Sequence, residues 1–160
     1  MTNDLNNILQ ECSQWAIKQN FHKYPVKGQI KKVAEELTEG FVHLHCGDLV
    51  DDDVGDILIA TNTWLTINFF NDDLVTKVDN YASLIKSIDE QDTKFYYNEW
   101  VDEYTECMKS LYNKELNIGK IITLASGLRK LRSKVDITTI VGDCFNTISG
   151  RHYTDLFTRD

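Results

Sequence analysis

Apolar residues recur every three to four positions along almost the whole chain, and a single proline interrupts them. This spacing places side chains on one face of an α-helix, whereas the apolar residues of a strand alternate with a period of two. One proline and eight glycines also supply few of the residues that tight turns between strands require. The pattern therefore predicts an all-α protein, a helical bundle in which amphipathic helices share one core.

Seven helices are expected from the apolar stripes. The connector after the first helix, Phe21 to Gly28, contains Pro25. The third helix is apolar on nearly all sides after Asp56, which is typical of a helix that is buried on most sides. The expected helices cover about 5–19, 29–46, 51–70, 74–88, 93–112, 118–133 and 137–148, and residues 150–160 are expected to form an irregular tail.

Residues that favour helix ends support two of these boundaries. Gly47 is expected to stop the second helix, and Asp136 is expected to cap the start of the seventh. No segment is of low complexity, and no linker separates two units. The 160 residues are therefore expected to form a single domain over residues 1–160.

Composition and charge argue against several classes of protein. The chain is 42% hydrophobic and 26% charged, as globular proteins are, and no apolar stretch is long enough to span a membrane. The net charge of -8 disfavours a nucleic-acid partner, because proteins that bind duplexes usually present a basic face. The N-terminus lacks the features of a signal peptide, and the four cysteines are widely separated. Both observations favour reduced thiols and a cytoplasmic location.

Two pairs of carboxylates stand on consecutive predicted helices. Glu36 and Glu39 lie on the second helix, and Asp53 and Asp56 lie near the start of the third. Residues three apart are separated by about 60° around a helix, so each pair presents its oxygens to one side. The short connector makes the two helices antiparallel neighbours. Four facing carboxylates would repel one another unless a divalent cation joined them, and oxygen ligands suit Mg²⁺, with Mn²⁺ as a substitute.

Each pair alone also has a structural explanation. Aspartates at a helix start interact favourably with the helix dipole, and Glu36 can form an ion pair with Lys32 one turn earlier. Both pairs together, at matching spacing on adjacent helices, favour the metal site. His43 lies on the same side of the second helix as the glutamates and could support the site without binding the metal.

The acidic motifs resemble those of the all-α nucleotide pyrophosphohydrolase superfamily, which includes MazG and the dimeric dUTPases. The matching residues are Gln29 to Glu39 (ExxE) and Asp53 to Leu58 ([ED]xxD), although the family usually has Glu at the position of Asp53. Residues 5–21 are similar to the family's first helix, and residues 143–152 are weakly similar to its last.

The resemblance implies an Mg²⁺-dependent hydrolase that converts a (deoxy)nucleoside triphosphate into the monophosphate and pyrophosphate. It implies that the four acids bind the metal, that Glu36 or Glu39 helps to deprotonate the attacking water, and that Asn146 and Arg151 contact phosphates. For such a substrate, Lys32 is a candidate partner of the triphosphate and Phe21 a candidate contact of the base. The resemblance also implies a homodimer. The alternative from another class is a catalytically inactive helical interaction module of the same fold.

Weak internal similarity indicates a duplication, with degenerate repeats over about 29–88 and 96–151. Glu103 stands 67 positions after Glu36, whereas Asn117 and Lys120 stand 64 positions after Asp53 and Asp56. Identity between the halves is sparse, and chance similarity is the alternative.

A duplicated chain would be a fused pseudo-dimer with one active site. The second half could not hold a metal, because protonated Lys120 stands where a carboxylate is needed. The first half would supply the metal ligands, and the second would supply Asn146 and Arg151. Dimeric dUTPases resemble such an arrangement, and dUTP is therefore the leading candidate substrate.

Overall fold

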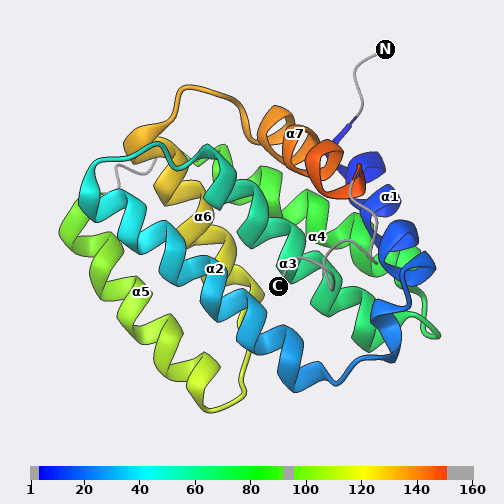
Figure 1. Ribbon diagram of the computed structural model, residues 1–160. Coiled ribbons are helices and arrows are strands. Elements are labelled where there is room, and N and C mark those ends of the chain that lie inside the picture. Colours follow the sequence, from blue (N-terminus) through cyan, green and yellow to red (C-terminus); the bar gives the residue numbers. More distant parts are fainter. Residues whose placement is uncertain (1–3, 92–95, 151–160) are drawn as a thin grey trace.

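The computed structural model describes residues 4–91 and 96–150, which form seven α-helices, one 3₁₀ turn and no strand (Figure 1). The predicted all-α bundle is therefore confirmed over the described residues. The helices are α1 (Leu5–Lys18), α2 (Val26–Cys46), α3 (Asp51–Phe69), α4 (Leu74–Asp89), α5 (Tyr97–Tyr112), α6 (Ile118–Arg132) and α7 (Ile137–Ser149), and the 3₁₀ turn is η1 (Phe21–Lys23). No helix in this part of the chain is long and apolar enough to cross a bilayer.

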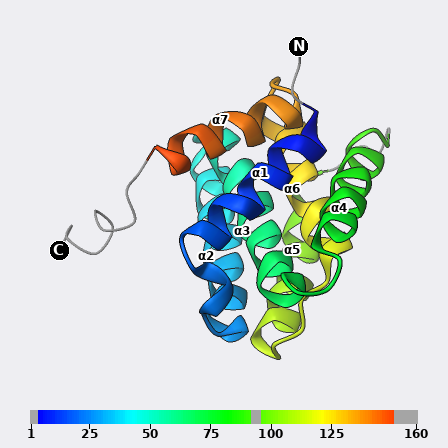
Figure 2. The ribbon, with the colours of Figure 1, turned by 90° about the vertical axis from the view of Figure 1, so that its right-hand side faces the viewer.

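The third helix occupies the centre of the bundle. α1, α2, α4, α6 and α7 all pack against it, and α7 crosses one end of the molecule (Figure 2). Val54, Ile57 and Leu58 have no solvent exposure. The prediction that this helix is buried on most sides is confirmed.

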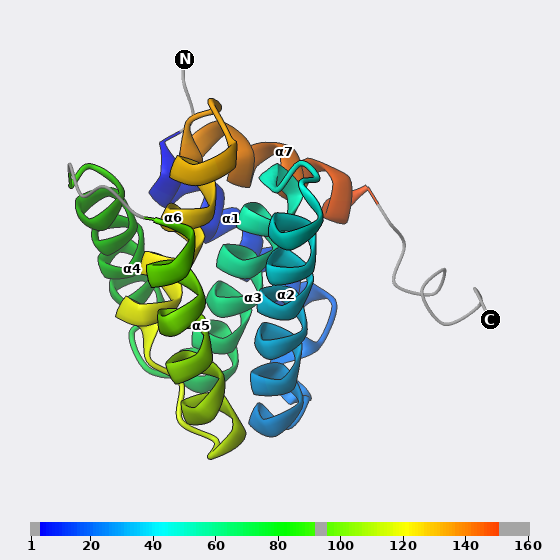
Figure 3. The ribbon, with the colours of Figure 1, turned by 90° about the vertical axis from the view of Figure 1, so that its left-hand side faces the viewer.

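α2 and α3 lie side by side and run in opposite directions (Figure 3), and α5 packs against α2 on the side away from α3 (Figure 1). Gly47 ends α2 at a φ of 79°, a left-handed conformation that glycine adopts without strain. The N–H of Gly47 donates to the carbonyl of Leu44, and that of Asp48 donates to the carbonyl of His43. This turn reverses the chain, so that the two acid-bearing helices become antiparallel neighbours as predicted.

The start of α2 differs from the prediction. The helix begins at Val26, three residues earlier than expected, because Pro25 has the φ of -62° that suits a helix entry. Gly28, which was taken as part of the connector, lies within the first turn of the helix. The expected start of the fifth helix, near residue 93, falls outside the described residues, as does most of the tail. The other helix boundaries agree with the prediction to within one residue.

The helix order has an internal regularity. The series α2, α3, α4 is followed by the series α5, α6, α7, and α7 packs on α3 while α4 packs on α6. Each last helix thus contacts the middle helix of the other series, and α4 also packs on α3 of its own series. This exchange is compatible with a fused pseudo-dimer, but the duplication itself stays a prediction.

Candidate functional site

The four predicted acids lie along the interface between α2 and α3. Glu36 and Asp53 are buried, with exposed fractions of 6% and 3%. Asp56 is half-buried, whereas Glu39 is exposed. Burying two carboxylates is costly unless each gains a partner, so the surroundings of Glu36 and Asp53 determine what the site can do.

Both buried acids have a partner on α2. The ammonium Nζ of Lys32 lies 2.9 Å from Oε1 of Glu36, one turn further along the helix. His43 Nδ1 lies 2.8 Å from Oδ2 of Asp53, which connects α2 to α3. The expected place of His43 beside the acids is therefore confirmed, and the Lys32–Glu36 ion pair is formed as the structural explanation of Glu36 requires.

The pKa values show that the acids influence one another. Burial, followed by the charge of Glu36, raises the pKa of Asp56 from 3.8 to about 7, with further contributions from Asp53 and Glu39. Burial and the charge of Glu36 also raise the pKa of Glu39. Burial raises the pKa of Asp53, although its hydrogen bond from His43 acts in the opposite direction. The four carboxylates therefore form one electrostatic cluster that disfavours additional negative charge.

The same cluster can be tested for its fit to a metal ion. Within residues 4–91 and 96–150, no three Asp, Glu, His or Cys side chains are positioned to hold one ion together. The convergence that the spacing predicts is thus not present in this arrangement of side chains, in which Lys32 and His43 supply positive or hydrogen-bonding partners. The donor chemistry does suit a hard cation: four carboxylates lie in one cluster, and Oε2 of Glu36 is buried without a hydrogen-bond partner. Metal binding would require these carboxylate side chains to rearrange.

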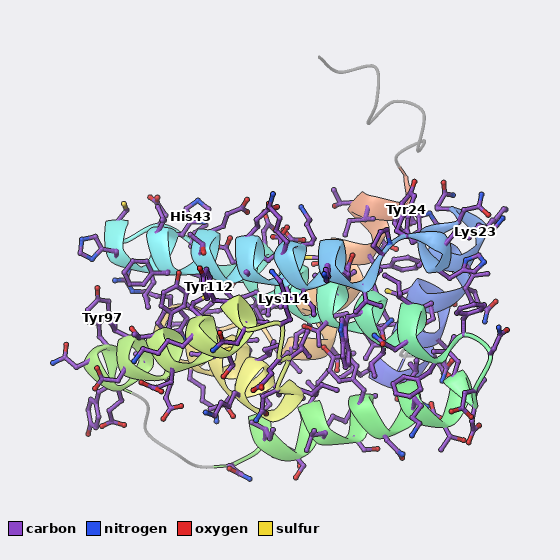
Figure 4. All side chains as sticks on the ribbon, turned by 90° about the horizontal axis from the view of Figure 1, so that it is seen from below. Lys23, Tyr24, His43, Tyr97, Tyr112 and Lys114 are labelled. Carbon is purple, nitrogen blue, oxygen red and sulfur yellow. The ribbon has the colours of Figure 1, made fainter. Side chains whose placement is uncertain are left out.

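A cavity of about 600 Å³ adjoins this cluster. Its acidic end is lined by Lys32, Glu36 and Asp56, and its other end is rich in aromatic rings. Tyr24 precedes α2, at the opposite end of that helix from His43 (Figure 4). The remaining lining residues are Trp15, Phe21, Pro25, Gly28, Gln29, Ile59, Ala60, Thr63 and Ile148.

The aromatic side chains at this cavity contact one another. The rings of Trp15 and Phe21 meet edge to face with 5.4 Å between centroids, and those of Phe21 and Tyr24 are 5.7 Å apart. The predicted base contact Phe21 therefore lies in the same cavity as Lys32 and two of the acids. The sequence did not single out Tyr24, Gln29 or the lining residues of α3 and α7 other than Asp56, because the cavity depends on how α1, α2, α3 and α7 pack together.

The C-terminal candidates are less closely connected to this cavity. Asn146 is exposed on α7 and is not among the residues that line it. Ile148 of the same helix does line the cavity, and the ring of Phe145 lies 6.4 Å from that of Trp15. Arg151 falls outside the described residues. The end of α7 thus reaches the cavity, but the side chain of Asn146 does not line it.

A second cavity, of about 560 Å³, lies between α5 and α6. It is lined by Glu103, Asn117 and Lys120. The proposed duplication relates these three positions to Glu36, Asp53 and Asp56. Asn117 also caps α6, because its side chain accepts a hydrogen bond from the backbone N–H of Lys120 at 3.1 Å. The other lining residues are Ile88, Glu99, Asp102, Gly119 and Thr123.

No family model, no curated protein and no solved structure matches this chain. The fold is shown as a packed all-α bundle, without a family assignment. The resemblance in the acidic motifs stands on those residues alone.

Proposed function

We propose that this chain is an Mg²⁺-dependent hydrolase that converts a nucleoside triphosphate, with dUTP as the leading candidate, into the monophosphate and pyrophosphate. One observation carries the proposal: a single cavity joins a group of aromatic rings to a lysine and two members of the carboxylate cluster. Its volume of about 600 Å³ lies within the range of small-molecule sites.

The aromatic end of the cavity suits a nucleobase. Trp15, Phe21 and Tyr24 offer ring faces and edges on which a flat base can stack, an interaction worth roughly 1–3 kcal/mol per base. The base then points its sugar and phosphates toward Lys32. This orientation follows from the polarity of the cavity, because its charged side chains gather at the other end.

Lys32 is suited to hold a phosphate. Burial lowers the pKa of its ammonium group, but the hydrogen bond and the charge of Glu36 outweigh burial and leave the pKa raised. Lys32 therefore stays protonated and can donate to a phosphate oxygen. When it does so, the carboxylate of Glu36 loses its present partner and becomes available for other contacts.

Mg²⁺, or Mn²⁺ in its place, would be held by Glu36, Glu39, Asp53 and Asp56. Such an ion offsets the charge of the phosphates and lowers the pKa of a bound water. The buried Oε2 of Glu36 has no hydrogen-bond partner and belongs to a residue that lines the cavity, so we propose that it accepts the proton of the attacking water. His43 orients Asp53 through their hydrogen bond.

The experiment is to measure pyrophosphate release from dUTP, dCTP, dGTP, dATP and their ribose forms, with and without Mg²⁺. Glu36→Gln and Glu39→Gln should each reduce the rate at least a hundredfold, as expected for groups that act in a transition state. Glu35→Gln is the matched control, because Glu35 is an exposed glutamate on the same helix. Circular dichroism verifies that each variant folds. Absence of Mg²⁺-dependent release from every nucleotide would contradict the proposal.

An inactive interaction module is the second candidate function. Its supporting observation is that Lys32 and His43 already provide partners for the two most buried acids, so the fold requires no metal. A module would bind its partner equally well with Mg²⁺ and with a chelator, whereas nucleotide hydrolysis would stop in the chelator.

Association into a homodimer is a separate proposal, which comes from the resemblance. Light scattering distinguishes the 18.5 kDa chain from a particle of twice that mass. A monomer with full activity would favour the fused pseudo-dimer, in which the packing of α7 on α3 completes the site within one chain.

A further inference from the structure

Gln29 lines the cavity, and a hydrogen bond to the backbone fixes the orientation of its side-chain amide. Its Nε2 donates a hydrogen bond to the backbone carbonyl of Ala60 at 2.8 Å. A carbonyl oxygen only accepts hydrogen bonds, so the atom that faces Ala60 must be the amide nitrogen of Gln29. Its Oε1 is therefore the atom that can accept a hydrogen bond from a ligand.

The position of Gln29 places it between the two ends of the cavity. It lies on α2 one turn before Lys32, and about 10 Å along the helix axis from Glu36, at 1.5 Å per residue. Phe21 and Tyr24 come shortly before it in the chain and line the same cavity. A nucleotide with its phosphates at Lys32 and its base against the aromatic rings would bring an edge of the base to Gln29.

Thr63, a second side chain that lines the cavity, likewise offers a ligand only a hydrogen-bond acceptor. The hydroxyl of Thr63 donates to the carbonyl of Ile59 at 3.1 Å, which leaves only the lone pairs of its oxygen for a ligand. Both side chains thus offer acceptors. A ligand group at this level of the cavity must donate, or its own acceptor remains unsatisfied.

We propose that Gln29 determines base specificity by accepting a hydrogen bond from a ring N–H on the edge of the base. Uracil, thymine and guanine have such an N–H, whereas cytosine and adenine have an acceptor nitrogen at the corresponding ring position. The bond to Ala60 prevents the amide from turning over to offer its nitrogen, so a base with an acceptor is disfavoured. The inference rests on the proposed function, because it assumes that the cavity holds a nucleotide.

The experiment uses the full chain and two pyrimidine nucleotides that differ at this edge. Binding of the non-hydrolysable α,β-imido analogues of dUTP and dCTP is measured by calorimetry in the presence of Mg²⁺. The unaltered protein should prefer the dUTP analogue by roughly tenfold or more, the range expected when a wrong base leaves a polar group unpaired. Gln29→Met, which keeps the length of the side chain and removes the acceptor, should reduce the ratio to about threefold or less.

Two further variants make the result specific. Gln29→Glu keeps an acceptor and should keep the preference, although its charge weakens the binding of both analogues. Gln14→Leu, at an exposed glutamine of α1, should change nothing. The inference is overturned if Gln29→Met keeps the full preference, or if it weakens both analogues equally, which would place Gln29 at the sugar or phosphates. Failure of the unaltered protein to bind either analogue would instead overturn the proposed function, and the inference with it.

Discussion

Replacing Asp56 by asparagine should stabilise the metal-free protein, and the gain should depend on pH. The pKa of this carboxyl rises from 3.8 to about 7 on folding, first because of burial and then because of the charge of Glu36. A raised folded-state pKa means that the folded protein holds the proton more tightly than the unfolded chain. The contribution of Asp56 to stability is therefore fully present below pH 3.8 and is lost as the pH rises to 7. Asparagine does not titrate and avoids this loss.

The size of the effect follows from the shift. One pKa unit corresponds to about 1.4 kcal/mol, so a rise of about three units would amount to roughly 4 kcal/mol at most. Asp56 is only half-buried, and water screens part of its interaction with Glu36. We therefore expect Asp56→Asn to raise the free energy of unfolding by about 2 kcal/mol at pH 8, and hardly at all at pH 4.

Urea denaturation in the presence of a chelator, followed by circular dichroism at pH 4, 6 and 8, measures this difference. Asp143→Asn is the matched control, because Asp143 is an exposed carboxylate of α7, and its effect should be small at every pH. A difference between Asp56→Asn and the unaltered protein that stays constant with pH would refute the reasoning. A loss of stability in Asp56→Asn at pH 8 would do so even more directly.

Two other predictions concern the surroundings of the acids. A Cβ atom at Gly55 would lie 2.8 Å from Cβ of Cys144, so Gly55→Ala should destabilise the protein by about 2 kcal/mol in urea denaturation. Gly28→Ala, where the new atom would meet nothing within 4 Å, should instead be neutral or stabilise the protein by up to about 1 kcal/mol. Equal effects of Gly55→Ala and Gly28→Ala would contradict the packing of α3 on α7. The hydrogen bond that His43 donates to Asp53 raises the pKa of His43 above 6.5, and NMR titration should show this pKa returning toward 6.5 in Asp53→Asn. An unchanged titration would exclude the His43–Asp53 contact in solution.

The helices could be predicted from the sequence because local chemistry marks their ends. The side chain of Asp136 accepts a hydrogen bond from the N–H of Thr139 and begins α7, and Gly47 ends α2, both as expected. The start of α2 was predicted wrongly because Gly28 was taken as a connector residue, although Pro25 had already set the entry to the helix. Glycine lowers helix propensity but does not forbid a helical turn.

The candidate site could be predicted only as far as helix geometry reaches. The spacing of Glu36, Glu39, Asp53 and Asp56 correctly indicated which side chains share the interface of α2 and α3. It gave no information on their rotamers, which depend on competition between mutual repulsion and the partners that each acid can reach. The cavity was beyond prediction for another reason: Trp15, Gln29 and Ile148 come together only through tertiary packing.

Binding of Mn²⁺ alone, followed by electron paramagnetic resonance, tests most directly whether the acids of α2 and α3 hold a divalent cation. The account predicts that each chain binds one Mn²⁺ and that Mg²⁺ displaces it. Glu36→Gln and Asp56→Asn should each weaken the binding at least tenfold, whereas Asp143→Asn should leave it unchanged. The carboxylate cluster is not a metal site if the unaltered protein binds no Mn²⁺, or if the two variants bind it as tightly as the unaltered protein does. Either result would contradict the proposed hydrolase.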